Sequence, residues 1–288
     1  MENSVMMIPV MMLPFVVYYY FFGQTLDLIH YSDARNNLSS NIGLHANELG
    51  GVALIILAYT INRKVDFKLL EYISIIASLL VIAFSLSRMA FLGVVIILLL
   101  SLPSLNMRQR ITVLMLGALL ALTLSPLIIS RLEYGIKDSK KMDLNSISAN
   151  RINFLWKPSL KMISDHPIQG QGYLSIWKGK SSTFKGFRLA THPHNAYLQV
   201  ALDMGMIGII LLIGFLISFI NTAKKRNKAL LYSISAWCLM GLTGFSFYPE
   251  FATLAIWLLY GISCAKPSKM NKPKTEAISH RHNTIVPL

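Results

Sequence analysis

Long runs of apolar residues alternate with short polar stretches along most of the chain. A helix needs roughly 17 to 25 apolar residues to cross about 30 Å of hydrocarbon. Runs at or near that length predict eight transmembrane helices, near residues 5–22, 43–61, 69–87, 89–102, 111–130, 195–220, 229–247 and 250–264. The fourth and eighth runs are the shortest. The pattern predicts an all-α, polytopic integral membrane protein.

The composition leads to the same class of protein. Of the 288 residues, 54% are hydrophobic and only 14% are charged, whereas roughly 25% of the residues in a soluble domain are charged. The mean hydropathy is +0.52. These values exclude an ordinary soluble domain.

The charge pattern predicts the orientation of the spans. A net charge of +14 could indicate a nucleic-acid partner, but in so apolar a chain lysine and arginine more economically mark cytoplasmic loops. Basic residues gather in every second connection, at 63–68, 108–110 and 224–228, and in the tail. We therefore expect both termini in the cytoplasm, no nucleic-acid partner, and the long connection on the outer face.

The predicted organisation has four parts: helices one to five in 1–130, an outer loop in 131–194, helices six to eight in 195–264, and a basic cytoplasmic tail in 265–288. The loop is strongly cationic, which suits an anionic ligand. Within it, Asn150 to Ser164 reads as an amphipathic helix whose apolar positions are Ile152, Leu155, Trp156, Leu160 and Ile163. We expect a flexible turn at Gly170-Gln171-Gly172.

Two arginines on the outer face are candidates for phosphate binding. Arg88 follows Ser85-Leu86-Ser87 in the tight turn between two spans, and Arg151 begins the loop helix. A guanidinium is always charged and presents a fork of donors that matches phosphate oxygens. Alternatively, Arg88 is an interfacial arginine that snorkels to water, and Arg151 is a solvated surface charge.

Polar residues also begin two of the predicted spans. His194 and Asn195 precede a helix whose N-terminal N–H groups would face an anion, and histidine can act as a general base near neutral pH. His45, Asn47 and Glu48 open the second span. The alternative is that Asn195 and the second group cap their helices, and that His194 is a wetted boundary residue.

These strings, taken in order, resemble the O-antigen ligase and polymerase superfamily of bacterial surface-polysaccharide enzymes. The resemblance spans most of the chain and rests on five features: Arg35 with Asn47-Glu48-Leu49, Ser85 to Arg88, Arg151 with Trp156, Asp165-His166-Pro167 with Gly170-Gln171-Gly172, and His194-Asn195 separated by nine residues from Gly205-x-x-Gly208.

The resemblance implies a metal-independent glycosyltransferase without a cofactor, in the bacterial inner membrane, with its active site on the periplasmic face. Its donor would be an undecaprenyl-diphosphate-linked glycan and its acceptor the lipid A core or another glycan. Arg88, Arg151 and His194 would be the catalytic residues, the arginines binding the diphosphate and the histidine deprotonating or orienting the acceptor hydroxyl. Substrate-binding residues would be Arg35, Asn47, Asn195, Trp156, Gly170 and Gly172.

Superfamily members usually have about a dozen spans, so the resemblance also implies that the first helices of the family are missing before residue 1. We favour a ligase, which moves a finished O-polysaccharide onto the lipid A core. An O-antigen or exopolysaccharide polymerase and a protein O-glycosyltransferase share its donor chemistry. A lipid-linked glycan transporter is a less favoured alternative, since the spans carry few ionisable residues, and a purely structural subunit is another.

Overall fold

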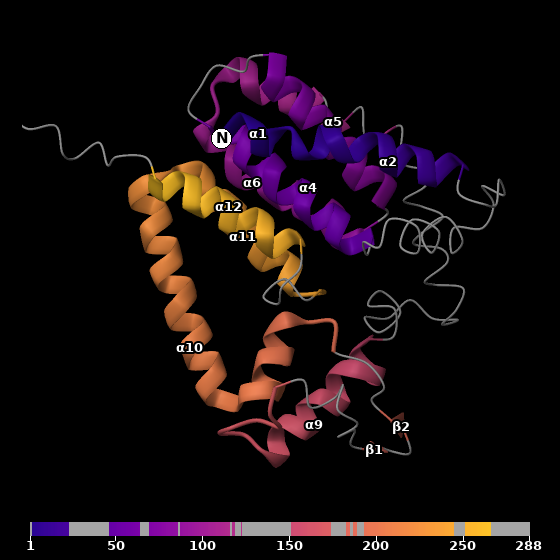
Figure 1. Ribbon diagram of the computed structural model, residues 1–288, viewed down its shortest axis with the longest axis vertical. Helices are drawn as coiled ribbons and strands as arrows, with labels where there is room; N and C mark the ends of the chain where they lie inside the picture. Colours follow the sequence, from indigo (N-terminus) through magenta and orange to yellow (C-terminus); the bar gives the residue numbers. More distant parts are fainter. Residues whose placement is uncertain are drawn as a thin grey trace, which may run out of the picture.

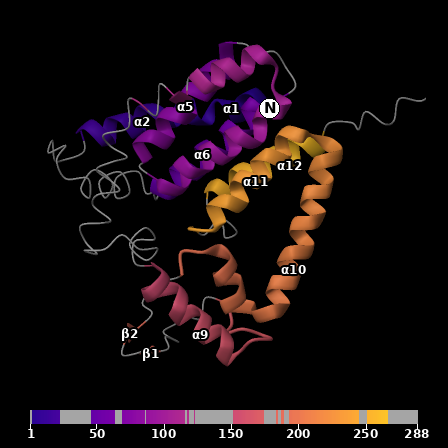
Figure 2. The same ribbon diagram turned by 180° about the vertical axis from the view of Figure 1, so that it is seen from behind.

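The computed structural model describes residues 2–22, 46–63, 69–85, 87–115, 117–118, 122, 151–173, 183–184, 187–188, 193–244 and 251–265. Figures 1 and 2 show a helix bundle and a smaller lobe, which the long helix α10 joins.

The bundle consists of apolar helices from both ends of the chain. It contains α1 (Glu2–Met6), α2 (Ile8–Phe22), α4 (Ala46–Ile61), α5 (Leu69–Ser85), α6 (Arg88–Ser101) with the 3₁₀ turn η1 (Leu102–Ser104), α11 (Lys228–Gly241) and α12 (Phe251–Ala265). α4 lies at its centre, in contact with α5, α6, α11 and α12.

Small residues let these helices approach closely. A Cβ added to Gly93 of α6 would lie only 2.3 Å from a methyl group of Leu54 in α4, and one added to Gly51 would contact Met240 of α11. Close approach of this kind is how helices associate in a bilayer, where no hydrophobic effect drives them together. Gly93 and Gly51 thus bring α6 and α11 against the buried α4.

The lobe holds the loop helix and a small hairpin. A π-helical turn, η2 (Ile152–Trp156), leads into α9 (Lys157–Asp165), and β1 (Thr183–Phe184) pairs antiparallel with β2 (Phe187–Arg188). The expected amphipathic helix is present, but its expected apolar face is partly wrong, because Leu160 is exposed while Met162 is buried. Apart from turns and connections, the other described residues are helical, so the hairpin is a small departure from an all-α chain.

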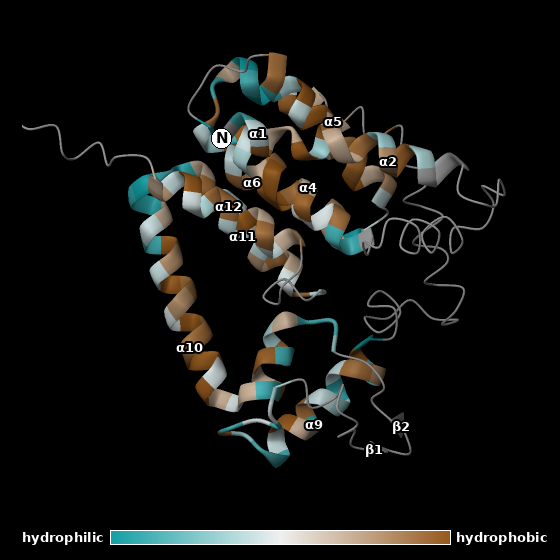
Figure 3. Cartoon of the chain, viewed as in Figure 1, coloured by the Kyte–Doolittle hydropathy of each residue, from teal (hydrophilic) through white to brown (hydrophobic). Residues whose placement is uncertain are grey.

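The helix α10 (Ala196–Arg226) is broken at Gly205, whose φ of 61° and ψ of −152° are not helical. A first arm, Ala196–Met204, lies in the lobe below the bundle, and a long arm, Met206–Arg226, runs from the lobe back to the bundle (Figure 1). Figure 3 shows apolar residues along the long arm. By length and composition α10 could cross a membrane, and most of its apolar window is exposed.

Each predicted span contains helix wherever it falls on described residues. Five shorter apolar helices, Asn3–Tyr18, Asn47–Ile61, Leu69–Ser85, Arg88–Ser104 and Phe251–Ala265, accompany α10. The fifth predicted span is described only in part, and helix begins there at Met107. Asn106 and Gln109 cap that helix reciprocally, each side chain accepting from the other's backbone N–H. An apolar, helical bundle is thus confirmed.

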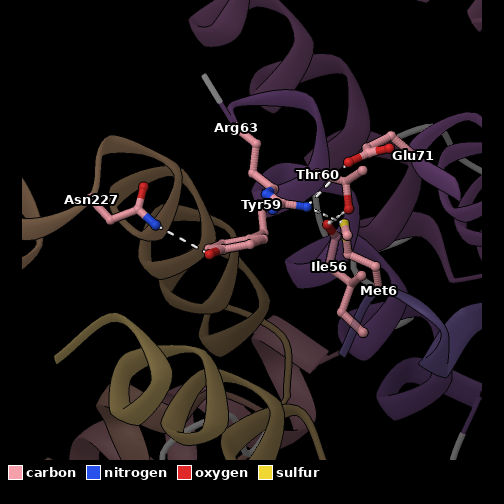
Figure 4. Close-up of polar contacts among 7 residues, drawn as sticks. All are labelled: Met6, Ile56, Tyr59, Thr60, Arg63, Glu71 and Asn227. Carbon is pink, nitrogen blue, oxygen red and sulfur yellow. Dashed lines mark hydrogen bonds and ion pairs between the residues drawn. The ribbon is translucent and has the colours of Figure 1, made fainter. Parts of the chain in front are cut away.

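Polar side chains link the helices at the end of the bundle where α4 ends. Arg63 Nη1 lies 3.2 Å from Glu71 Oε1 at the start of α5 and 3.2 Å from the Met6 sulfur (Figure 4). On the opposite side of α4, Asn227 donates to the hydroxyl of Tyr59. Arg63 and Arg226, which belong to two loops expected in the cytoplasm, both lie at this end of the bundle.

Candidate functional site

The other end of the bundle gathers most of the candidate residues. There α4 begins, α5 ends and α6 begins, and their contact is tight: a Cβ on Gly50 would lie 2.8 Å from Ser85 Oγ and 2.9 Å from the Ala90 Cβ. Asn47 lies one turn before Gly50 on α4 and is half-buried. The structure thus brings Asn47 to the same helix ends as Ser85 and Arg88.

Arg88 is the first residue of α6, and Ser87 caps that helix by accepting a hydrogen bond from Ala90 N at 3.4 Å. The Arg88 side chain is half-buried. A cation in the first turn of a helix is electrostatically unfavourable, since free N–H groups already make that end positive. An anion bound beside Arg88 would relieve the repulsion.

Arg151 reaches from the lobe to the bundle. Its Nη1 donates to the main-chain oxygen of Thr243, just after α11, at 3.0 Å. This contact places the start of the loop helix beside the same bundle end. Thr243 was not predicted from the sequence, because its carbonyl group carries no residue-specific signal.

Trp156 holds the turn that carries His194. Its indole N–H donates to the Pro193 oxygen at 3.0 Å. His194 itself has a φ of 50°, the left-handed region that non-glycine residues rarely adopt. The structure therefore gives Trp156 a contact within the protein, next to a backbone conformation that a surrounding structure must enforce.

Asn195 is the N-cap of α10. Its Oδ1 accepts hydrogen bonds from the backbone N–H groups of Tyr197 and Leu198, both at 3.0 Å. The Tyr197 hydroxyl donates to the Cys238 carbonyl oxygen of α11 at 2.9 Å. The capping alternative for Asn195 is thus observed, and Tyr197, which sequence reasoning missed, attaches the first arm to the bundle.

The turn at Gly170-Gln171-Gly172 differs from the flexible turn that we expected. Gln171 N donates to Leu202 O at 2.7 Å and Gly172 N to Asp203 O at 3.0 Å, which ties the turn to the first arm. Gly170 has a φ of 70°, and a Cβ there would lie 2.6 Å from the backbone of α10. Gly170 is buried in this contact, whereas Gly172 is exposed with open space around its Cα.

The same turn supports the break in α10. Met206 N donates to Pro167 O at 2.8 Å and Ile207 N to Ile168 O at 3.3 Å. A Cβ on Gly205 would lie 2.4 Å from Ile168 O. We call Gly205 and the turn Pro167–Gly172 the pivot. The turn supplies acceptors for N–H groups whose helical partners the break removes.

Asp203 has a partner within its own helix. Its Oδ1 accepts from Gln199 Nε2 at 3.0 Å, and both side chains are buried. The buried carboxylate of Asp203 is therefore hydrogen-bonded within α10.

Two of the candidates, Arg35 and His45, lie outside the described residues. Within the described ranges, no group of three His, Cys, Asp or Glu side chains is placed to hold a metal ion. Metal independence stays a prediction.

The arrangement combines positive charge, an imidazole and a fixed turn at one end of the bundle. Arg88 and Arg151 supply permanent positive charge, His194 supplies an imidazole, and the turn that carries the imidazole is fixed by Trp156 and Asn195. Such a set can stabilise an anionic leaving group and accept a proton from a hydroxyl group.

Comparison with known proteins gives one family. Residues 73–213 match the family described as O-Antigen ligase. That range holds Arg88, Arg151, His194 and Asn195 and ends within the long arm of α10, whereas Asn47 precedes it.

Two curated relatives match a shorter segment. A protein of Rickettsia conorii, named "Putative polysaccharide ligase", is 28% identical over 122 residues, which cover 38% of this chain and 29% of the relative. A Rickettsia felis protein of the same name is 30% identical over 122 residues, covering 38% of this chain and 30% of the relative. The match thus spans less than a third of each relative. No solved structure matches the chain.

Proposed function

Because residues 73–213 place the chain in the O-antigen ligase family, we propose that it is a ligase-type glycosyltransferase of the bacterial inner membrane. It moves a glycan from an undecaprenyl diphosphate carrier onto an acceptor, the lipid A core, at the periplasmic face. Both termini lie in the cytoplasm, and no metal ion takes part.

The observation that carries this proposal is the convergence of Arg88, Arg151 and the His194 turn at one end of the bundle. Arg151 contacts Thr243 beside the end of α11, Tyr197 contacts Cys238 in α11, and Trp156 contacts Pro193. These three bonds join residues that are 37 to 92 positions apart in sequence. The negative charge of a diphosphate suits this positively charged end of the bundle.

The proposed reaction needs little from the protein besides placement and charge. The bond between the sugar and the diphosphate breaks, and the acceptor hydroxyl oxygen forms a bond to the same anomeric carbon. Arg88 and Arg151 stabilise the negative charge that the diphosphate gains. His194 takes the proton of the hydroxyl group, a task for which an imidazole is suited near neutral pH.

Deletion of the gene, followed by complementation, tests the proposal. We expect the deletion strain to lose core-attached O-polysaccharide and to accumulate glycan on the carrier. The wild-type gene should restore it, and His194→Ala, Arg88→Ala and Arg151→Ala should not, although each variant still inserts in the membrane.

Lys161→Ala is the matched control, because Lys161 is a cation of the same lobe that is exposed and pairs with Asp165. It should restore the wild-type pattern. A single repeat still attached to the core in the deletion strain would instead identify a polymerase. Full activity of both His194→Ala and Arg88→Ala would contradict the mechanism.

A further inference from the structure

Exposed apolar side chains lie in the pivot and directly beside it, on both of the segments that meet there. On the side of the turn, Ile168 is 65% exposed, and Tyr173, the residue after Gly172, is 56% exposed. On the side of α10, Met204, Met206 and Ile207 are exposed as well. Large apolar patches on a protein surface usually mark a contact with a partner or with a membrane.

The position of the turn is fixed relative to the long arm of α10. The bonds from Met206 N to Pro167 O and from Ile207 N to Ile168 O join it to the first turn of that arm. The close approach of Gly170 and Gly205 leaves no room for sliding between them. Ile168 therefore lies at the same depth in the membrane as the start of the long arm.

The long arm itself indicates that depth. At 1.5 Å per residue, Met206 to Arg226 extends roughly 30 Å, close to the thickness of a bilayer's hydrocarbon. Its far end carries Lys224, Lys225 and Arg226, which hold that end at a boundary with water. The start of the arm, and the pivot with it, then lies at the opposite boundary.

We propose that the pivot, together with the adjacent Tyr173, is a bilayer anchor: Ile168 inserts among the lipid chains at the outer boundary, and Tyr173 lies among the headgroups. The partner is the phospholipid surface. This inference goes beyond the proposed function, because it requires no glycan chemistry.

The surroundings of Ile168 favour lipid over a protein partner. The exposed apolar surface continues from Ile168 through Ile207 to Ile210 and Leu211 on the long arm, and lipid covers the exposed side of a spanning helix. His166 and Gln169, on either side in sequence, are exposed and polar, which suits a boundary and not the bilayer centre. Tyrosine is enriched at such boundaries.

Spin labels on the full-length chain test the anchor. In a Cys238→Ala, Cys264→Ala background, nitroxides are placed by Ile168→Cys and, as a second probe, Tyr173→Cys. The protein is reconstituted in vesicles of phosphatidylethanolamine and phosphatidylglycerol, and collision with oxygen, which partitions into lipid, is compared with collision with a water-soluble nickel chelate.

Two positions calibrate the result. Ser164→Cys, exposed at the end of α9, reports water, and Ile210→Cys, exposed on the long arm, reports lipid. We expect the Ile168 label to favour oxygen several-fold more than the Ser164 label does, and the Tyr173 label to fall between Ser164 and Ile210.

Three results would overturn the proposal. The Ile168 label could collide with nickel as often as the Ser164 label, which would place the pivot in water. It could be shielded from both reagents, which would mean that protein covers it. The Ile210 label could prove aqueous, which would remove the lipid-exposed arm on which the argument depends. None of these readouts depends on ligase activity.

Discussion

The indole N–H of Trp156 donates to the carbonyl oxygen of Pro193, 3.0 Å away, and so joins the loop helix to the residue before His194. Trp156→Phe removes this donor while it keeps an aromatic ring. The lost bond is worth about 1 kcal/mol, but a displaced base can reduce the rate roughly a hundredfold. We expect glycan transfer by purified protein to fall by roughly tenfold or more.

Trp237→Phe is the control for this experiment. It also removes an indole donor, which bonds Thr253 Oγ1 at 3.4 Å between α11 and α12. Its turnover should stay near that of the wild type. Equal losses in the two variants would show that Trp156 matters only for packing.

Asn195→Ala should reduce both stability and transfer. The change removes an acceptor for two backbone N–H groups, and loss of an N-cap costs about 0.5 to 2 kcal/mol. Asn195→Ser retains a capping oxygen and should recover most of the melting temperature in detergent. Asn227→Ala removes the N-cap of α11 at the opposite bundle end, so it should lower the melting temperature without the same loss of transfer. A fully active Asn195→Ala variant would separate the cap from the site.

Gly205→Ala should be strongly destabilising. A left-handed backbone costs a non-glycine residue about 1 to 3 kcal/mol, and the new Cβ would meet Ile168 O within 2.4 Å. We expect the melting temperature in detergent to fall by several degrees. Gly214→Ala, on the same helix with nothing within 4 Å of its Cβ, should leave it unchanged or raise it. An unaffected Gly205→Ala variant would contradict the close contact at the pivot.

The Arg63–Glu71 pair should matter more than an exposed pair of the same kind. The Glu71 side chain is only 6% exposed, so Arg63→Ala removes the cation from a buried carboxylate, at a cost of about 3 to 5 kcal/mol. Lys161→Ala breaks an ion pair whose side chains are 59% and 46% exposed, and should cost less than about 1 kcal/mol. Thermal unfolding of both variants measures the difference. Similar melting temperatures would show that Arg63 contributes no more than a surface charge.

Much of the fold was accessible from the sequence, because apolar run length reports bilayer crossing directly. The helices of the bundle followed from such runs, and Asn195 followed from its position before one. The break in α10 was not predicted. Gly205 and Gly208 stood out in the sequence only by their spacing from His194-Asn195. The carbonyl oxygens of Pro167 and Ile168, which make a break at Gly205 possible, come from a distant turn.

The candidate site was accessible from the sequence as residue types but not as contacts. Arginine, histidine and asparagine side chains carry recognisable chemistry. Their partners at Thr243, Pro193 and Cys238 are backbone carbonyl groups, which every residue has. Pairing of this kind depends on how the chain folds, and no residue pattern records it. The catalytic and substrate-binding roles of the candidate residues stay predictions.

Because α10 is broken at Gly205, the number of residues in its first arm fixes the position of His194. His194 and Gly205 are connected by the helical segment Ala196–Met204, fixed at one end by Tyr197 and at the other by the pivot. Inserting or deleting one residue there would turn the imidazole by roughly 100° about the helix axis and move it about 1.5 Å along it. Lengthening the chain between Tyr173 and Pro193, beyond the turn that is bonded to α10, would have no such effect. Natural length variation should therefore avoid the eleven positions after His194 and accumulate between Tyr173 and Pro193.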